Sequence, residues 1–334
     1  MRNPAQIKAR TPAAPTGRRT TRSSWVMRAP RSTRCKRGDG SLRRSPPWGR
    51  RIVPGKRWQG LSGPYSERMS ERGGPTVLIA VGDELLSGHT LDTNSNLLAK
   101  ALFAAGHPVR RVEVVGDDPD AIIAAVRRAQ TEAGVSRIVV SGGIGPTPDD
   151  RTFGAVARAL DRPLELNPVA FAHIETLVRR MHEAGWVDTD TVSEANRRSA
   201  LVPAGSTVLP NRRGMAPGLA IELGERTLFV LPGIPREFST MVEEELIPHY
   251  FQDGAKPHVT EVRYTSVPEA ELAGPLGTLE GEFPDVIAGS YPHIERRELV
   301  IRLRGLNEDR VAAAAARLRE LRSDEEPPGG IERR

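Results

Sequence analysis

The run VSGGIGPTPDDRT, residues 140–152, combines residue types that could hold an anionic ligand. Its three glycines permit a tight turn in which main-chain N–H groups approach an oxyanion, and Asp149 and Asp150 supply two adjacent carboxylates. A simpler interpretation makes the glycines a turn and one aspartate the N-cap of the next helix. Two carboxylates exceed what capping needs, so we favour a binding site.

The segments before this run alternate between strand and helix patterns. Buried-strand patterns occupy residues 76–82, 109–116 and 137–143, and helical spacing of leucine and alanine occupies 94–106 and 118–134. Strands that alternate with helices predict right-handed crossovers and a parallel sheet. Ligands bind such sheets at the carboxyl ends of the strands, which is where the glycine-rich run falls.

Three further loops rich in Gly, Pro, Asp or Glu lie beside strand patterns. They read VGDELLSGHTLDTNS from Val81, LPNRRGMAPGLAIEL from Leu209 and LFVLPGIPREF from Leu228. Loops of this composition at several strand edges favour one shared site over separate turns. Together the four loops supply the candidate residues Asp83, Glu84, Ser87, Asn94, Gly142, Gly143, Gly145, Thr147, Asp149, Asp150, Arg151, Asn211, Gly214, Pro232, Gly233 and Glu237.

The first 68 residues differ in composition from the rest. They hold 18 of the 48 Lys and Arg residues but only two acidic ones, which leaves 30 basic and 40 acidic residues in the remainder. The overall charge of +6 therefore does not indicate that the body binds nucleic acid or membrane. A transit peptide, a nucleic-acid-binding arm and a start codon assigned too early all fit this leader. We favour the last, with Met69 as the true start.

The composition also indicates the cellular compartment of the body, by which we mean the residues after 68. Cys35 is the only cysteine, so we expect neither an intrachain disulfide nor a zinc site built from thiolates. The sequence has no apolar region of a signal peptide and no run of 18 apolar residues. We therefore expect a cytoplasmic protein without a membrane segment.

Five motifs carry a resemblance to a known family, in the order VGDELLSG, DTNS, GGIGPTPDD, LPNRRGMAPG and LPGIPRE. From Thr76 to about Phe251 the chain resembles the MoaB/Mog-type molybdopterin-binding fold, and most closely the competence/damage-inducible protein A (CinA) family. The resemblance implies an α/β fold, a three-layer α/β/α sandwich with a mostly parallel sheet. It also implies two branches of function: molybdenum-cofactor proteins, which bind molybdopterin, and CinA-like proteins, some of which hydrolyse ADP-ribose.

The glycine-rich motif favours the CinA-like branch. Molybdenum-cofactor enzymes typically read GGTG with an Arg before the final Asp, where this chain has Ile144 and Asp149. The resemblance therefore implies hydrolysis of ADP-ribose to AMP and ribose 5-phosphate, with Glu84, Asp149 and Asp150 as catalytic residues. Asp83 and Asp150 would hold Mg²⁺, Mn²⁺ or Co²⁺. The alternatives are a molybdopterin-binding protein of cofactor biosynthesis and a nucleotide-binding module without catalysis.

The remaining candidates are expected to bind the substrate. Gly142, Gly143 and Gly145 would donate N–H groups to phosphate oxygens, and Arg151 or Arg236 would neutralise charge in the transition state. The stretch SEANRRSALVPAGSTVLPN also resembles the CinA-like pattern, with Arg198 where that pattern usually has Gln.

The C-terminal part alternates strand and helix patterns in a small α+β unit that resembles a KH-like domain. It contains a G-x-x-G at Gly274 and Gly277, but residues 256–322 carry 10 basic and 11 acidic side chains, so we do not expect nucleic-acid binding. We expect self-association, as in relatives, and neither the amidase domain of longer CinA proteins nor its deamidation of nicotinamide nucleotides. The predicted parts are a basic leader (1–72), a MoaB/Mog-like domain (73–254), the KH-like domain (255–323) and a disordered tail (324–334).

Overall fold

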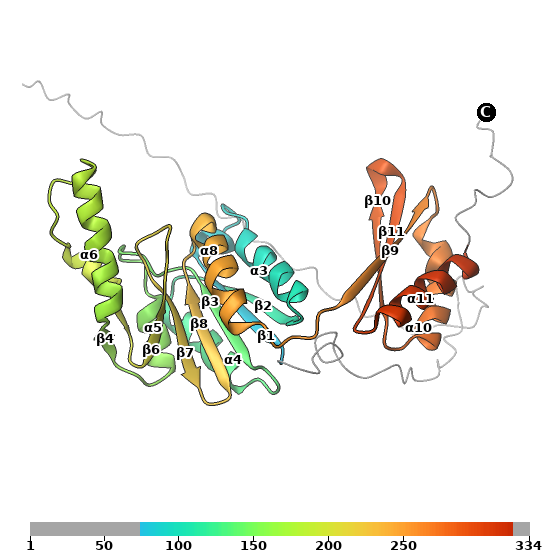
Figure 1. Ribbon diagram of the computed structural model, residues 1–334, viewed down its shortest axis with the longest axis horizontal. Coiled ribbons are helices and arrows are strands. Elements are labelled where there is room, and N and C mark those ends of the chain that lie inside the picture. Colours follow the sequence, from blue (N-terminus) through green and yellow to red (C-terminus); the bar gives the residue numbers. More distant parts are fainter. Residues whose placement is uncertain (1–73, 323–334) are drawn as a thin grey trace, which may run out of the picture. The chain divides into compact units, whose positions relative to one another are not determined.

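A computed structural model describes residues 74–322 (Figure 1). The predicted leader with Met69, and the predicted tail, lie outside the described residues. Within them, the N-terminal part packs hydrophobic cores on both faces of a six-stranded sheet, and the C-terminal part has a separate core beside a three-stranded sheet. The candidate residues all belong to the N-terminal part.

A six-stranded sheet forms the centre of the N-terminal part, with the strand order β2-β1-β3-β8-β7-β6. The first four strands in this order run parallel, and β7 pairs antiparallel with both β8 and β6. The expected mostly parallel sheet is thus confirmed. The strands are β1 (Thr76–Val81), β2 (Val109–Val115), β3 (Arg137–Ser141), β6 (Ser206–Leu209), β7 (Gly218–Leu223) and β8 (Arg226–Leu231).

Helices cover both faces of this sheet, because its central strands are apolar on both sides. In β1, Val77 and Ile79 pack into one core together with residues of the helices α4 and α5. Leu78 points to the opposite core, which includes residues of α3 and α8. These three layers confirm the expected α/β/α sandwich. The helices are α3 (Thr93–Ala104), α4 (Pro119–Thr131), α5 (Thr152–Ala159) and α8 (Pro235–Met241), the last continued by η1 (Val242–Leu246) and α9 (Ile247–Tyr250).

Local sequence signals explain where these helices begin and end. The side chain of Asp118 accepts hydrogen bonds from the N–H groups of Asp120 and Ala121, with Pro119 in the first turn of α4. Gly106, just beyond α3, has a φ of 82°, which favours glycine.

A smaller substructure adjoins the edge of the sandwich. It consists of the two-stranded sheet of β4 (Leu164–Leu166) and β5 (Leu201–Pro203), with α6 (Pro168–Glu183) and α7 (Glu194–Arg198) between them in the chain. The side chain of Asn167 caps α6 by accepting hydrogen bonds from the N–H groups of Val169 and Ala170.

The C-terminal part is the expected small α+β unit. Its antiparallel sheet has the order β10-β11-β9 and packs against helices around a core that includes Tyr264, Ile301 and Leu318. Strand β10, which the sequence patterns did not reveal, pairs with β11. The elements are β9 (His258–Thr265), η2 (Glu269–Leu272), α10 (Ala273–Glu282), β10 (Ile287–His293), η3 (Ile294–Arg296), β11 (Glu298–Gly305) and α11 (Glu308–Leu321). Among the described helices, none is long and apolar enough to cross a membrane.

Candidate functional site

The candidate loops meet because parallel strands end at one edge of the sheet. Ala80 near the end of β1 pairs with Ser141 at the end of β3, and Ser141 pairs in turn with Leu231 at the end of β8. The Ser141 hydroxyl donates a hydrogen bond to the carbonyl of Pro232, 3.2 Å away. The loops that follow β1, β3 and β8 therefore start side by side, although they are far apart in the sequence.

Acidic side chains gather at this edge. The main-chain N–H of Asp83 donates to a carboxylate oxygen of Asp117 at 2.9 Å, and the N–H of Asp117 donates to Asp83 at 3.2 Å. Burial and the negative charges of Asp83, Glu84 and Asp149 raise the pKa of Asp117, although the hydrogen bond from Asp83 opposes them. We call Asp83, Glu84, Asp117 and Asp149 the acidic rim. Its members come from the loops after β1, β2 and β3.

Asp117 is a member of the rim that the sequence patterns did not reveal. The run after residue 116 has the pattern of a helix start, where Asp118 caps the helix as described above. The position of Asp117 two residues after the end of strand β2 was the available signal, since every parallel strand of this sheet ends at the same edge.

Two positions of the glycine-rich loop, 142 and 143, have room for glycine only. Gly142 and Gly143 have φ values of 106° and 63°. A Cβ on Gly142 would collide with the carbonyl oxygen of Val81, and a Cβ on Gly143 would lie 2.6 Å from the hydroxyl of Thr152. That hydroxyl donates to the carbonyl of Gly142 at 2.8 Å. The loop is therefore packed tightly against both β1 and the start of α5.

Asp150 closes the next turn of this loop. One of its carboxylate oxygens accepts hydrogen bonds from the N–H of Thr147 at 2.8 Å and from the Thr147 hydroxyl at 2.6 Å. The same oxygen lies 2.6 Å from the place of a Cβ on Gly145. The simpler interpretation, in which Asp149 or Asp150 caps the following helix, is wrong. Helix α5 begins at Thr152, and the Arg151 side chain before it makes no capping bond.

Asp149 is the more exposed of the two aspartates. Contact with the Thr147 side chain, its own main-chain N–H and the positive charge of Arg151 lower the pKa of Asp149, against a small effect of burial. Arg151 itself donates from Nε to the carbonyl of Pro148 at 3.1 Å.

The loops after β1 and β8 also contact each other. The side-chain amide of Asn94 donates to the carbonyl of Gly233 at 2.8 Å. Asp83 and Glu84 form the short helix α2 (Asp83–Leu86), and the Ser87 hydroxyl donates to the Glu84 carbonyl at 3.2 Å.

Three further candidates form a second cluster. The side-chain amide of Asn211, which is 1% exposed, donates to a carboxylate oxygen of Glu237 at 2.7 Å and to the carbonyl of Ala216 at 2.8 Å. Its oxygen accepts from the N–H groups of Arg213 and Gly214. Gly214 leaves room for the Glu237 carboxylate, which occupies the place of a Cβ. Glu237 thus has a structural partner in Asn211.

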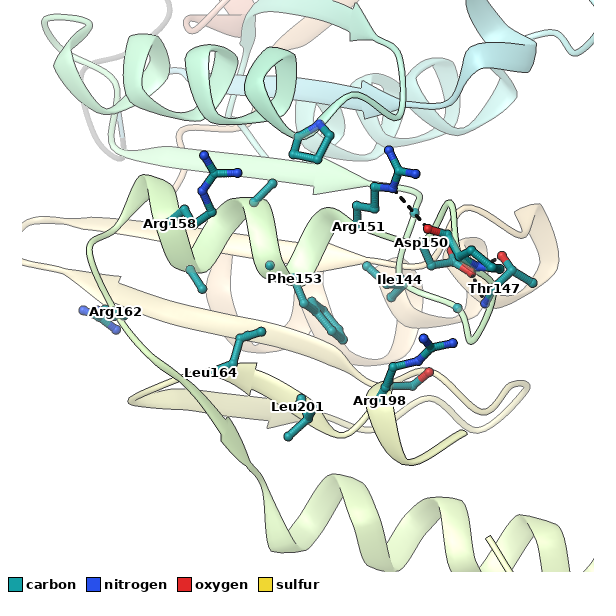
Figure 2. A pocket seen from close by; sticks show the side chains of 18 residues that line it. Ile144, Thr147, Asp150, Arg151, Phe153, Arg158, Arg162, Leu164, Arg198 and Leu201 are labelled. Atoms are coloured by element: carbon teal, nitrogen blue, oxygen red, sulfur yellow. Dashed lines mark hydrogen bonds between the residues drawn. The ribbon is translucent and has the colours of Figure 1, made fainter. Parts of the chain in front are cut away.

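The glycine-rich loop also borders a cavity of about 530 Å³ (Figure 2). Gly143, Gly145, Thr147, Asp150 and Arg151 all line it. Arg198 from α7 reaches the same loop, where its guanidinium donates to the carbonyl of Pro146 at 3.1 Å.

The side chains of the acidic rim fit a divalent cation only with additional ligands. Within residues 74–322, no three His, Cys, Asp or Glu side chains are grouped to hold an ion by themselves. Mg²⁺ commonly binds through one or two carboxylates plus phosphate oxygens and water. The hydrogen-bonded pair Asp83 and Asp117 fits such a role, whereas an oxygen of Asp150 is already bonded twice by Thr147.

Comparison with known proteins places this site in a family. Residues 77–251 match the family described as a probable molybdopterin binding domain. The chain belongs to this family. Residues 257–326 match the middle domain of FAD synthase, which is compatible with the small C-terminal unit.

Relatives of this family include CinA-like proteins, which confirms the expected resemblance. Protein PH0439 of Pyrococcus horikoshii is 42% identical over 175 residues, which cover 51% of this chain and 67% of that protein. A CinA-like protein of Citrifermentans bemidjiense is 38% identical over 214 residues, or 63% of this chain and 48% of the relative. The chain thus spans about half of that CinA-like protein. A crystal structure of the protein CinA from Thermoplasma acidophilum is 31% identical, covers 51% of this chain and 95% of its own, and has a TM-score of 0.45.

Proposed function

We propose that the N-terminal part hydrolyses the diphosphate of ADP-ribose with the help of a divalent cation, and releases AMP and ribose 5-phosphate. The observation that carries this proposal is the acidic rim beside the glycine-rich loop. A diphosphate brings its own negative charge, so it can approach four carboxylates only if a cation lies between them. A carboxylate such as Asp117, whose pKa is raised by burial and by neighbouring carboxylates, is a common mark of such sites.

The proposed reaction is a displacement at phosphorus. A water oxygen forms a bond to one phosphorus, and the bond from that phosphorus to the bridging oxygen breaks. The bridging oxygen leaves on the other phosphate, and the protons of the water pass to a carboxylate of the rim and to solvent. A bound cation would neutralise the diphosphate and favour ionisation of the water.

The residues of this chain would divide the remaining tasks. Asp83 and Asp117 would hold the cation, and Glu84 and Asp149 would orient the water or accept a proton from it. The N–H groups of the loop from Gly143 to Gly145 would bind phosphate oxygens, as in other glycine-rich anion sites. Arg151 follows Asp149 closely and would counter the charge that develops on the phosphate.

Incubation of the full chain with ADP-ribose and Mg²⁺, Mn²⁺ or Co²⁺ tests the proposal. We expect AMP and ribose 5-phosphate in equal amounts by ³¹P NMR, and no products when EDTA is present. Binding of ADP-ribose without any turnover, under all three metals, would contradict hydrolysis and favour the nucleotide-binding module.

Molybdopterin binding is the second candidate, and the family match to a probable molybdopterin binding domain supports it. The two candidate functions differ in whether ADP-ribose competes with the pterin for the site. If the loop binds molybdopterin for cofactor biosynthesis, its affinity for the pterin will be indifferent to ADP-ribose. Self-association and a cytoplasmic location remain predictions.

A further inference from the structure

The cavity beside the glycine-rich loop extends away from the acidic rim. It lies between this loop, the helix α5 and the segments around β4 and β5 (Figure 2). Pro119, two residues beyond Asp117, lines it at one side. A ligand in the cavity could therefore reach from the substructure of β4 and β5 to the edge of the sheet where the rim lies.

The lining of this cavity has two chemically different regions. Apolar side chains form one region: Ile144, Phe153, Leu164 and Leu201. Arg151 and Arg198 form the other, at the glycine-rich loop, while Arg158 and Arg162 line the cavity elsewhere. Figure 2 shows Arg151 and Arg198 on either side of the turn from Thr147 to Asp150.

Arg151 and Arg198 are charged groups whose contacts leave capacity for an anion. Each donates to a main-chain carbonyl of the loop, of Pro148 and Pro146 respectively. Neither forms an ion pair with a carboxylate of the described residues. A guanidinium has five N–H donors, and a carbonyl uses one or two of them. The two loop contacts hold both groups near the turn, and guanidinium groups bind phosphate in a bidentate manner.

We propose that this cavity binds the nucleoside monophosphate half of the substrate. Its phosphate would lie at the turn that Arg151 and Arg198 contact, and its planar base against the apolar region that includes Phe153 and Leu201. The volume of about 530 Å³ falls within the range of roughly 300–1,000 Å³ of small-molecule sites. This assignment rests on the proposed function, and it makes Arg198 a residue that determines substrate specificity.

Binding of AMP, adenosine and ribose 5-phosphate to the full chain, measured by titration calorimetry without metal, tests this proposal. Arg198→Gln removes the charge but keeps a donor for the Pro146 carbonyl. We expect this variant to bind AMP at least tenfold more weakly, with unchanged affinity for adenosine. The matched control is Arg197→Gln. Arg197 precedes Arg198 in α7, but it pairs with Glu194 at 3.7 Å and does not line the cavity.

A second variant tests the cavity independently of charge. Gly154 of α5 lines the cavity, and a Cβ at this position meets nothing within 4 Å. We expect the leucine side chain of Gly154→Leu to fill part of the cavity and to weaken the binding of both AMP and adenosine. Wild-type affinity for AMP in both Arg198→Gln and Gly154→Leu would overturn the proposal.

Failure of the AMP-binding test can be distinguished from failure of the proposed ADP-ribose hydrolysis. Weaker AMP binding by Arg198→Gln supports the nucleoside site even if the wild-type chain does not hydrolyse ADP-ribose. Hydrolysis by the wild type together with unchanged AMP affinity in both variants overturns the nucleoside site and leaves the proposed hydrolysis in place.

Discussion

Asp83 and Asp117 each accept a hydrogen bond from the other's main-chain N–H, at 3.2 and 2.9 Å respectively. This reciprocal contact joins the loop after β1 to the loop after β2. It fixes two carboxylates side by side although 34 positions separate them in the chain. Gly116 permits this approach, because a Cβ there would collide with the Asp83 carboxylate.

The glycine-rich loop should not tolerate side chains at its tightest point. Gly142→Ala would place a methyl group against the Val81 carbonyl at a φ of 106°, so we expect it to lower the free energy of unfolding by about 1–3 kcal/mol. Gly154→Ala, in open space within α5, should leave it unchanged or raise it by up to about 1 kcal/mol. Urea unfolding of the two variants checks this, and equal stability would contradict the described loop.

A polar cluster at the opposite edge of the sheet should contribute to stability. Arg137 donates to Asp253 at 2.9 Å, contacts the buried ring of His107 at 3.3 Å and lies over the ring of Phe251. We expect Arg137→Leu to cost about 1–2 kcal/mol in urea unfolding. Arg158→Leu, which removes an exposed pair at 3.2 Å, should cost less than about 0.5 kcal/mol. A larger loss for Arg158→Leu would refute this ranking.

The same cluster predicts a pH dependence. Burial of Asp253 opposes its ionisation, but the charge and hydrogen bond of Arg137, its own N–H and His107 together lower the pKa of Asp253 below its usual value. Its contribution to stability is therefore present above about pH 4 and lost as the pH falls through the lowered pKa. We expect the wild type to exceed Asp253→Asn in stability at pH 6, and the difference to shrink toward pH 3. A difference that is constant with pH would argue against the ion pair.

Substitutions of Asn211 and Glu237 should distinguish a role in stability from a role in substrate binding. Asn211→Ala would leave the N–H groups of Arg213 and Gly214 without their acceptor, so we expect a loss of about 1–3 kcal/mol in unfolding free energy. Glu237→Gln keeps an acceptor for the Asn211 amide and should cost less than about 1 kcal/mol. If Glu237 also binds substrate, this variant will hydrolyse ADP-ribose at least tenfold more slowly at nearly unchanged stability. Wild-type turnover would assign Glu237 to structure alone.

Much of the fold could be predicted from the sequence, because its signals are local. Apolar runs such as 76–82 mark the parallel strands, and Asp118 with Pro119 marks a helix start. The glycines at 142 and 143 mark a loop that only glycine can adopt. The convergence of distant loops followed from strand direction alone.

Other features depend on contacts that no local pattern encodes. Asp117 lies in the rim because β2 pairs with β1, and Asp150 bonds to Thr147 instead of capping α5. The cavity requires α7 to bring Arg198 to the glycine-rich loop, from a segment 52 positions away. Strand β10 was missed because its sequence, IAGSYPH, lacks a clear alternation of apolar residues.

The rate of ADP-ribose hydrolysis in Asp117→Asn, compared with Asp118→Asn, tests the central claim most directly. Asp117 belongs to the acidic rim, whereas the adjacent Asp118 caps α4, a role that Asn fills equally well. We predict a rate at least about 100-fold below wild type for Asp117→Asn, with unchanged or higher thermal stability because one of four like charges is removed. Asp118→Asn should stay within about twofold of wild type. Equal rates in the wild type and both variants would contradict a catalytic acidic rim.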